Sequence, residues 1–319
     1  MRQRDRLVRA PEVDGPAVTP SAPVRRPSLL FGLLRTARPR QWVKNVLVFA
    51  APGAAGVLTQ REPLLRSLAA FALFCVTASG TYFLNDALDH VADRLHPRKR
   101  HRPVAAEVVP VGLAKTLGLA LVGAAIGAAL LLGLWRLALV LGIYGAVTIS
   151  YSLWLKEEPV IDLAAVASGF VLRTVAGGAA TGIPISHWFL IVASFGSLFM
   201  VAGKRHAEHL ELGDDSPSHR ATLSSYSGSY LRYIRSVTSA VTISSYCLWA
   251  FEKADAAGAG VGVWFELSIM PFVLGILRYA LLLDRGQGGA PEDIVLADRG
   301  LQVIGFAWVV TFCIGIYGR

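Results

Sequence analysis

Residues 82–103 read YFLNDALDHVADRLHPRKRHRP, and the interpretation of the whole chain depends on this stretch. It starts as the end of an apolar run, continues with four oxygen-bearing side chains within nine positions, and finishes in a basic cluster. The four are Asn85, Asp86, Asp89 and Asp93. Carboxylates at the end of an apolar segment are costly to desolvate unless a cation accompanies them. The pattern therefore favours a functional site at the end of a membrane helix over a solvated, acidic helix end.

The composition of the chain is that of a membrane protein. The 319 residues are 54% hydrophobic and only 17% charged, whereas soluble domains carry about 25% charged residues. Cys75, Cys247 and Cys313 all lie in apolar runs without metal-ligand spacing, so no disulfide framework is expected. The net charge of +9 fits basic loops on the cytosolic side of a membrane, and nucleic-acid binding is not expected.

Nine apolar segments are long enough to cross a bilayer, which takes roughly 20 residues of helix. We predict an all-α integral membrane protein with spans at 42–58, 67–89, 112–133, 136–155, 160–182, 186–203, 234–252, 262–283 and 301–317. Residues 1–28 are rich in Arg, Pro and Ala and are predicted to be a disordered, basic cytosolic tail. Residues 29–319 are predicted to form a single transmembrane domain.

Basic residues predict the orientation of these spans. An odd number of spans puts the termini on opposite sides of the membrane. With the N-terminus in the cytosol, the cytosolic segments hold 21 Lys and Arg residues and the external segments five. The excess predicts a cytosolic N-terminus and an extracytoplasmic C-terminus in the inner (plasma) membrane. Loops 85–103 and 204–220 then both face the cytosol.

The carboxylate motif predicts a metal site. A helix continuing past Leu84 would place Asn85, Asp89 and Asp93 on one face, because each step of four residues turns by only about 40°. Mg²⁺ prefers such oxygen ligands and usually shares its coordination with substrate phosphates. We expect Mg²⁺ on these three residues and a diphosphate that Lys99 and Arg102 also hold. The basic run also fits a positive-inside anchor, and the two roles can coexist.

The stretches NDALDHVAD (85–93) and HPRKRHRP (96–103) resemble the first signature, N-D-x-x-D-x-x-x-D, of the UbiA-type intramembrane prenyltransferase superfamily. In that family this signature binds Mg²⁺ and a diphosphate at the cytosolic mouth of a helical bundle. The resemblance extends from about Arg38 over the rest of the chain. It implies a UbiA-like bundle of about nine helices with a cytosol-facing active-site cavity. It also implies a catalytic role for Asn85, Asp89 and Asp93.

The chain departs from the superfamily at its second signature. Where another D-x-x-x-D is usual, residues 201–215 read VAGKRHAEHLELGDD, with Lys204 and Arg205 in place of acidic residues. This basic pair is expected to hold a substrate phosphate. RPRQWVKN (38–45) and FGSLFMVAGKRHAE (195–208) are similar to one branch of the superfamily, which transfers a sugar phosphate to a lipid phosphate.

The resemblance to that branch implies a specific reaction. A 5-phosphoribosyl group would pass from phosphoribosyl diphosphate (PRPP) to a polyprenyl phosphate such as decaprenyl phosphate, with release of diphosphate, to supply cell-wall arabinogalactan synthesis. The alternative is a UbiA-type prenyltransferase that uses prenyl diphosphate and an aromatic acceptor, and the basic loop argues against it. A transporter is disfavoured because no repeated halves are visible in the sequence.

Four more residues are candidate substrate contacts. Lys44 lies one turn into the first span, Tyr82 lies three residues before Asn85, and Lys156 ends the fourth span. Arg173 lies deep in the fifth span, where an ionisable side chain is a functional candidate. Snorkelling of Lys44, an interfacial position of Tyr82 and an internal pair for Arg173 stay open as structural alternatives. Homo-oligomerisation, prenyl chain length and the number of Mg²⁺ ions also stay open.

Overall fold

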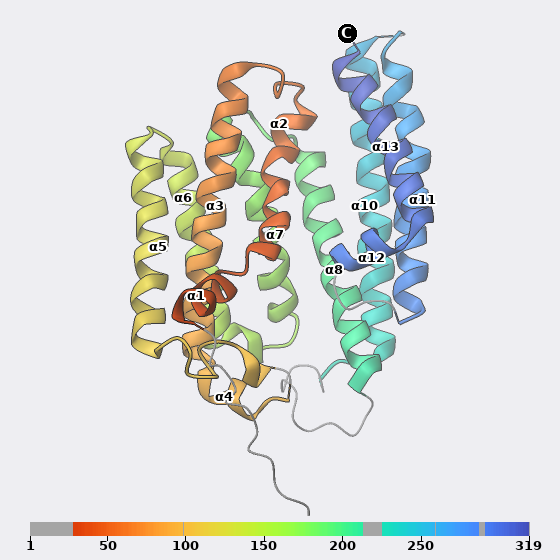
Figure 1. Cartoon of the computed structure of the whole chain (residues 1–319). Coiled ribbons are helices and arrows are strands. Elements are labelled where there is room, and N and C mark those ends of the chain that lie inside the picture. Colours follow the sequence, from red (N-terminus) through yellow and green to blue (C-terminus); the bar gives the residue numbers. More distant parts are fainter. Residues whose placement is uncertain (1–27, 98, 213–224, 259, 287–290, 319) are drawn as a thin grey trace, which may run out of the picture.

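The computed structural model describes residues 28–97, 99–212, 225–258, 260–286 and 291–318, and these residues form helices and their connections. The long helices run up and down in one bundle (Figure 1). The predicted tail, apart from Ser28, lies outside the described residues. In chain order the helices are α1 Leu29–Ala37, the 3₁₀ helix η1 Pro39–Phe49, α2 Ala50–Ala54, α3 Arg61–Leu88, α4 His90–Leu95, η2 Lys99–His101, α5 Val111–Leu131, α6 Trp135–Leu153, η3 Leu155–Glu157, α7 Ile161–Thr181, α8 His187–Leu212, α10 Gly228–Ala257, α11 Gly262–Asp284, α12 Pro291–Ala297 and α13 Arg299–Tyr317.

Seven helices in the described ranges are long and apolar enough to cross a membrane: α3, α5, α6, α7, α8, α11 and α13. The other two predicted spans, 42–58 and 234–252, correspond to η1 with α2 and to α10. α10 has 30 residues and packs along α8 and α11. Its buried face carries hydroxyl side chains, including Thr238 and Thr242, which lower its hydropathy. The predicted all-helical membrane fold is confirmed, and the count of nine spans stays a prediction.

The outside of the bundle is apolar. α13 has a mean hydropathy of 1.8 over its most apolar window, yet only 11% of that window is buried. Phe306 and Val303 on this helix are 71% and 69% exposed. A helix that is apolar on its exposed face as well as its buried face fits a lipid environment. The chain is therefore a multi-pass membrane protein.

Two close helix contacts depend on glycine. A Cβ atom on Gly80 of α3 would lie 2.8 Å from the carbonyl oxygen of Gly118 on α5. A Cβ atom on Gly177 of α7 would lie 1.8 Å from the carbonyl oxygen of Val48, so η1 lies directly against α7. Small residues permit such backbone approach between membrane helices. The contact at Gly177 therefore sets the position of η1 against α7.

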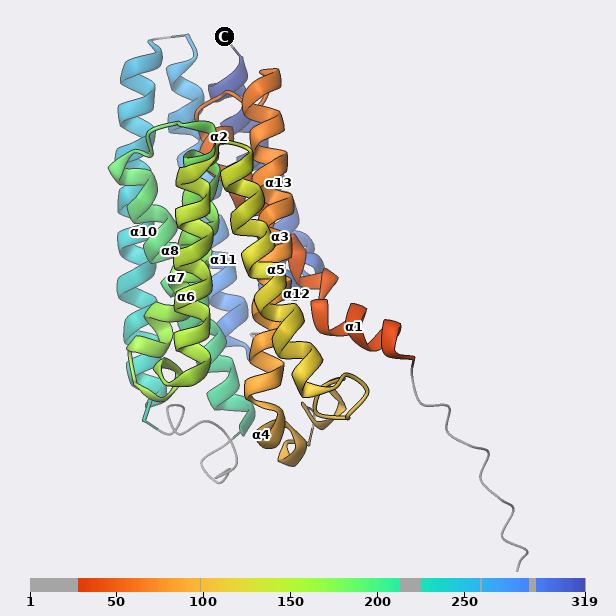
Figure 2. The same cartoon turned by 90° about the vertical axis from the view of Figure 1, so that its left-hand side faces the viewer.

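The two predicted motif regions lie at the same end of the bundle. α3 leads to α4 at the lower end in Figure 1, where α8 ends and α10 begins, and Figure 2 shows the same arrangement from the side. The C-terminus lies at the opposite end. This arrangement fits the expectation that both motif loops share one side of the membrane. Which side faces the cytosol stays a prediction.

Candidate active site

The carboxylate motif does not lie on one continuous helix. α3 ends at Leu88, Asp89 has φ −88° and ψ 0°, and α4 begins at His90. Nδ1 of His90 lies 2.9 Å from the carbonyl oxygen of Ala87, one of the last carbonyls of α3. The expectation of a single face for three motif residues was wrong because the chain bends at Asp89. By their contacts, the motif residues form two groups.

The first group contains Asn85 and Asp89. Oγ of Ser152, near the end of α6, donates a 2.8 Å hydrogen bond to Oδ1 of Asn85. Nζ of Lys156 on η3 lies 2.7 Å from Oδ1 of Asp89. The side chains of Lys156 and Asp89 are 25% and 22% exposed, so solvent and solutes can reach them. The structure thus brings together three predicted site residues, Asn85, Asp89 and Lys156.

The second group contains Asp86 and Asp93, which are both buried. Nη1 of Arg102 lies 3.2 Å from Asp86 and 2.7 Å from Asp93 and donates to both. Arg38 also donates to Asp86, and its guanidinium lies over the ring of Tyr82, 4.8 Å from the centroid. Sequence reasoning missed Arg38 and Asp86 as members of the site. The seven-residue spacing of Asp86 and Asp93, close to two helical turns, could have indicated a shared face.

The oxygen donors of the first group fit a Mg²⁺ ion whose coordination a substrate completes. Across the described ranges, no three His, Cys, Asp or Glu side chains converge into a metal cage. Mg²⁺ in proteins is commonly held by one or two carboxylates together with substrate phosphates and water. Asn85 and Asp89 supply such a partial set from adjacent turns. Asp93, the third predicted ligand, instead contacts Arg102.

The basic pair near the end of α8 divides between two environments. Arg205 is 4% exposed. Its Nε lies 3.0 Å from Asp162, its Nη1 2.7 Å from Glu208, and its Nη2 3.2 Å from the hydroxyl of Tyr151. Arg205 therefore ties α8 to α6 and α7. The side chain of Lys204 is 46% exposed, and its Nζ lies 3.9 Å from Glu208. Of the pair, Lys204 is the more accessible to a substrate.

Tyr226 holds Asp162 from the other side. Its hydroxyl donates to Oδ1 of Asp162 and accepts a 2.6 Å hydrogen bond from the backbone N–H of Val160. Val160 has φ +68°, a conformation that β-branched residues rarely adopt. Burial, reinforced by the hydrogen bond to Asp162, raises the pKa of the Tyr226 phenol, so it stays a donor. No local sequence signal links Tyr226 to Asp162.

Arg173 is enclosed by neutral partners. Its Nε lies 2.8 Å from Oδ1 of Asn45, and its Nη2 3.0 Å from the hydroxyl of Tyr144. Its guanidinium also lies over the rings of Phe74, Tyr144 and Phe170, at 5.0 to 5.6 Å from their centroids. The alternative of an internal partner for Arg173 matches this geometry. Through Asn45, Arg173 fixes η1 against α7.

Two more predicted phosphate contacts, Lys99 and Lys44, lie in 3₁₀ helices. Lys99 begins η2, shortly after α4, and its backbone N–H donates to Nδ1 of His96 at 3.3 Å. Lys44 lies in η1. Both lysine side chains are half-buried.

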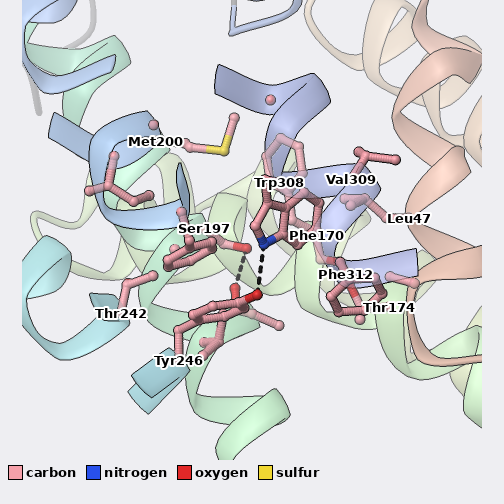
Figure 3. A pocket seen from close by; sticks show the side chains of 18 of the residues that line it. Leu47, Phe170, Thr174, Ser197, Met200, Thr242, Tyr246, Trp308, Val309 and Phe312 are labelled. Carbon is pink, nitrogen blue, oxygen red and sulfur yellow. Dashed lines mark hydrogen bonds between the residues drawn. The ribbon is translucent and has the colours of Figure 1, made fainter. Parts of the chain in front are cut away.

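A large apolar pocket lies beside η1. It has a volume of about 990 Å³ and is lined by residues of η1, α2, α7, α8, α10, α11, α12 and α13. Its wall is mostly apolar, and inside it Nε1 of Trp308 donates a 2.7 Å hydrogen bond to the hydroxyl of Tyr246 (Figure 3). Lys44 is the one predicted site residue among its described lining residues. The structure thus has an apolar pocket and separate polar groups at helix ends, and the predicted single cytosol-facing cavity is not confirmed.

Comparisons with known proteins agree over most of the chain. The model of the UbiA prenyltransferase family matches residues 46–297. The chain is 45% identical to "Decaprenyl-phosphate phosphoribosyltransferase" of Corynebacterium glutamicum over 91% of this chain and 88% of that protein. It is 44% identical to the Mycobacterium tuberculosis protein of the same name, over 89% of this chain and 94% of the relative.

Solved structures show the same fold. A UbiA homolog from Archaeoglobus fulgidus bound to GPP and Mg²⁺ aligns with a TM-score of 0.67 at 17% identity, covering 90% of this chain and 100% of that one. Digeranylgeranylglyceryl phosphate synthase aligns with a TM-score of 0.63 at 15% identity, covering 91% and 99%. At these identities the likeness establishes the fold alone.

Proposed function

The chain belongs to the UbiA prenyltransferase family, and on that premise we propose that it is a Mg²⁺-dependent phosphoribosyltransferase acting on a lipid phosphate. It transfers 5-phosphoribosyl from PRPP to polyprenyl phosphate and releases diphosphate, and its product supplies cell-wall arabinan synthesis. One observation carries the proposal. Relatives named decaprenyl-phosphate phosphoribosyltransferase are 43–45% identical over about nine tenths of the chain.

The reaction forms one bond and breaks one. A phosphate oxygen of the lipid attacks C1 of the ribose, the bond from C1 to the diphosphate oxygen breaks, and diphosphate leaves with the electron pair. The lipid phosphate is already ionised near neutral pH, so no strong general base is needed. The protein must hold two anionic substrates close together and stabilise the charge of the leaving diphosphate. Basic residues around an oxygen-rich metal site are suited to both tasks.

The first group of motif residues, Asn85 and Asp89, is the proposed diphosphate site. Bound Mg²⁺ would neutralise charge on the leaving diphosphate. Asn85 and Asp89 would hold the ion, and the hydrogen bond from Ser152 to Asn85 fixes the direction of the amide oxygen. Lys156, whose Nζ lies 2.7 Å from Asp89, is the proposed contact for a diphosphate oxygen. Asp93 remains a predicted third ligand of the ion, and Tyr82, Lys99 and Arg102 remain predicted contacts of the diphosphate.

The lipid acceptor is proposed to lie in and above the apolar pocket. A volume of about 990 Å³ is at the upper end of the roughly 300–1,000 Å³ range of ligand pockets. The pocket suits a length of prenyl chain, and the rest of a long chain can lie in the bilayer. Lys44, which lines the pocket, and Lys204, at the end of α8, are the proposed contacts for the lipid phosphate. Arg173 and Arg205 are proposed to position η1 and α8.

The proposed setting is the plasma membrane. In this arrangement η1 with α2 and α10 complete nine crossings, the N-terminus lies in the cytosol, and the C-terminus lies outside. The shared end of α3 and α8 then faces the cytosol (Figure 1), where water-soluble PRPP is available. The excess of basic residues in the predicted cytosolic segments supports this orientation.

The test uses purified protein with Mg²⁺, PRPP and polyprenyl phosphate, followed by mass analysis of the lipid. The expected product is polyprenyl-phosphoryl-5-phosphoribose with one equivalent of diphosphate. Prenyl transfer from a prenyl diphosphate to an aromatic acid, with no ribosylated lipid formed, would contradict the proposal and favour the alternative prenyltransferase.

A substitution in the basic loop sharpens this test. Lys204→Gln removes a charge-assisted hydrogen bond worth about 1.5–3 kcal/mol. We expect catalytic efficiency to fall about ten- to hundredfold, because about 1.4 kcal/mol corresponds to a factor of ten. Lys115→Gln is the matched control, because Lys115 is an exposed lysine on α5. An equal loss in both variants would speak against a substrate contact at Lys204.

A further inference from the structure

The carboxylate motif is charge-balanced by its own neighbours. Each of its three carboxylates contacts a basic side chain at salt-bridge distance. In the described part of the chain these basic partners also number three. The motif therefore has no excess negative charge that would attract a free cation. The pairs are Arg38 with Asp86, Arg102 with Asp86 and Asp93, and Lys156 with Asp89.

This balance opposes the binding of a free divalent cation. Such an ion would compete with Lys156 for Asp89 and would add two positive charges to a neutral cluster next to an ammonium group. Like charges a few ångströms apart repel strongly where water is partly excluded. A metal ion that arrives with a diphosphate differs, because the complex is anionic. It offers the displaced lysine a new partner at the moment of displacement.

Lys156 is better suited to such an exchange than Arg102. Arg102 bridges two carboxylates that are 1% and 3% exposed, so its departure would take a positive partner away from two buried charges. The side chains of Lys156 and Asp89, by contrast, are 25% and 22% exposed, so water or a substrate can reach this ion pair. A lysine also carries its charge on a flexible stem with rotatable donors. Lys156 lies on η3, directly after α6.

We propose that Lys156 is an exchangeable counter-ion that makes metal binding at Asp89 conditional on PRPP. In the substrate-free protein the ammonium of Lys156 holds the Asp89 carboxylate. On substrate binding it moves to the diphosphate and leaves the carboxylate to the metal. The inference rests on the proposed function for the identity of the anion. The exchange itself rests on the charge balance of the motif.

The test measures metal affinity and not turnover. Mn²⁺, a paramagnetic substitute for Mg²⁺, is titrated into purified full-length protein, and free Mn²⁺ is followed by electron paramagnetic resonance with and without PRPP. Wild-type protein should bind Mn²⁺ weakly alone and at least about tenfold more tightly with PRPP. Lys156→Gln should bind Mn²⁺ alone about ten- to hundredfold more tightly than wild type, because a repelling charge is gone. The increase in Mn²⁺ affinity that PRPP causes should be smaller in this variant than in wild type.

Three further variants separate this role from a structural one. Lys156→Arg should keep the weak binding of wild type. Arg94→Gln, which removes an exposed ion pair with Glu107 outside the motif, should leave Mn²⁺ affinity unchanged. Adding Asp89→Asn to Lys156→Gln should abolish the gained Mn²⁺ binding. Thermal unfolding of each variant confirms that it is folded.

The outcomes distinguish the two proposals. If folded Lys156→Gln binds Mn²⁺ no more tightly than wild type, or if wild type binds Mn²⁺ tightly without PRPP, the counter-ion role is overturned. If Lys156→Gln gains Mn²⁺ affinity while PRPP affects neither protein, the counter-ion role stands. In that case the assignment of PRPP as donor fails.

Discussion

Asp89 combines a bend in the chain, a salt bridge and a candidate metal ligand in one residue. Asp89→Ala would remove the carboxylate and leave Lys156 without this partner. Because that ion pair is partly exposed, its loss should cost at most about 1 kcal/mol of stability. We expect turnover to fall below detection, while the thermal unfolding midpoint in detergent stays nearly unchanged. Near-normal turnover at saturating Mg²⁺ would show that Asp89 is not a ligand.

Tyr226 is a residue whose importance is visible only in the structure. Tyr226→Phe removes the donor to Asp162 and the acceptor for the N–H of Val160. Leaving buried polar groups unpaired costs about 1–3 kcal/mol, so the unfolding midpoint should drop. Because the pKa of the Tyr226 phenol is raised, the phenol is protonated at pH 7 and at pH 9, and the loss should be equal at both.

Tyr230→Phe is the matched control for that measurement. Tyr230 stacks on Tyr226 with an interplanar angle of 7° but is itself 38% exposed. Its substitution should leave the unfolding midpoint unchanged. A destabilisation by Tyr226→Phe that disappears at pH 9 would mean that the Tyr226 phenol is already ionised at that pH, so that its pKa is lowered and not raised.

The residue scale also separates what the sequence can predict from what it cannot. Asn85 and Asp89 are recognisable because their spacing carries the motif within one short stretch. Their partners Ser152 and Lys156 come from a segment 67 residues away, and only the lysine carried a sequence signal. Arg205 is of a residue type that often contacts phosphate. Its surroundings, however, are those of a residue that holds neighbouring helices together. Composition alone could not distinguish these roles, because both use a guanidinium group.

At the scale of elements, the contact of η1 with α7 leaves the least room for a side chain at the glycine between them. Gly177→Ala would place a methyl group 1.8 Å from the carbonyl oxygen of Val48, so the backbone must shift. Overpacking of this kind typically costs about 1–3 kcal/mol. We expect a lower unfolding midpoint and reduced turnover, because η1 carries Lys44.

Gly127→Ala on α5 is the control for this contact. A Cβ atom at Gly127 would meet nothing within 4 Å. Alanine is favoured over glycine inside a helix by roughly 0.5–1 kcal/mol, so this variant should be as stable as the parent or slightly more stable. If both substitutions had the same effect, the close approach of η1 to α7 would not be a determinant of stability.

Elements were predictable where hydropathy alone determines them. The apolar runs predicted the seven long, apolar helices because a bilayer requires continuous helix. The bend at Asp89 was not predicted, because helical periodicity continues through it in the sequence. η1 was expected as part of an ordinary span, yet it is a 3₁₀ helix that follows Arg38, which has φ +53°. η1 also makes tertiary contacts that no local sequence pattern indicates, such as the hydrogen bond from Arg173 to Asn45.

At the scale of the whole molecule, the polar groups and the apolar pocket occupy different parts of one bundle. The polar groups lie near the shared end of α3 and α8. The pocket lies among η1, α2 and the helices from α7 onward. A water-soluble donor and a lipid acceptor need such a division, because each approaches from a different phase. The sequence predicted both kinds of residue, but the position of the pocket depends on how eight segments pack.

The orientation of the bundle gives the last prediction. The 21 basic residues of the predicted cytosolic segments against five in the external ones predict that the shared end of α3 and α8 faces the cytosol. A reporter fused after Arg319 should therefore behave as extracytoplasmic, and one inserted within 287–290 as cytosolic. The insertion is the internal control, since a single crossing, α13, separates the two positions. A cytosolic reporter after Arg319 together with an external one at 287–290 would invert the bundle. PRPP would then have to be supplied outside the cell membrane, and the proposed donor would be untenable.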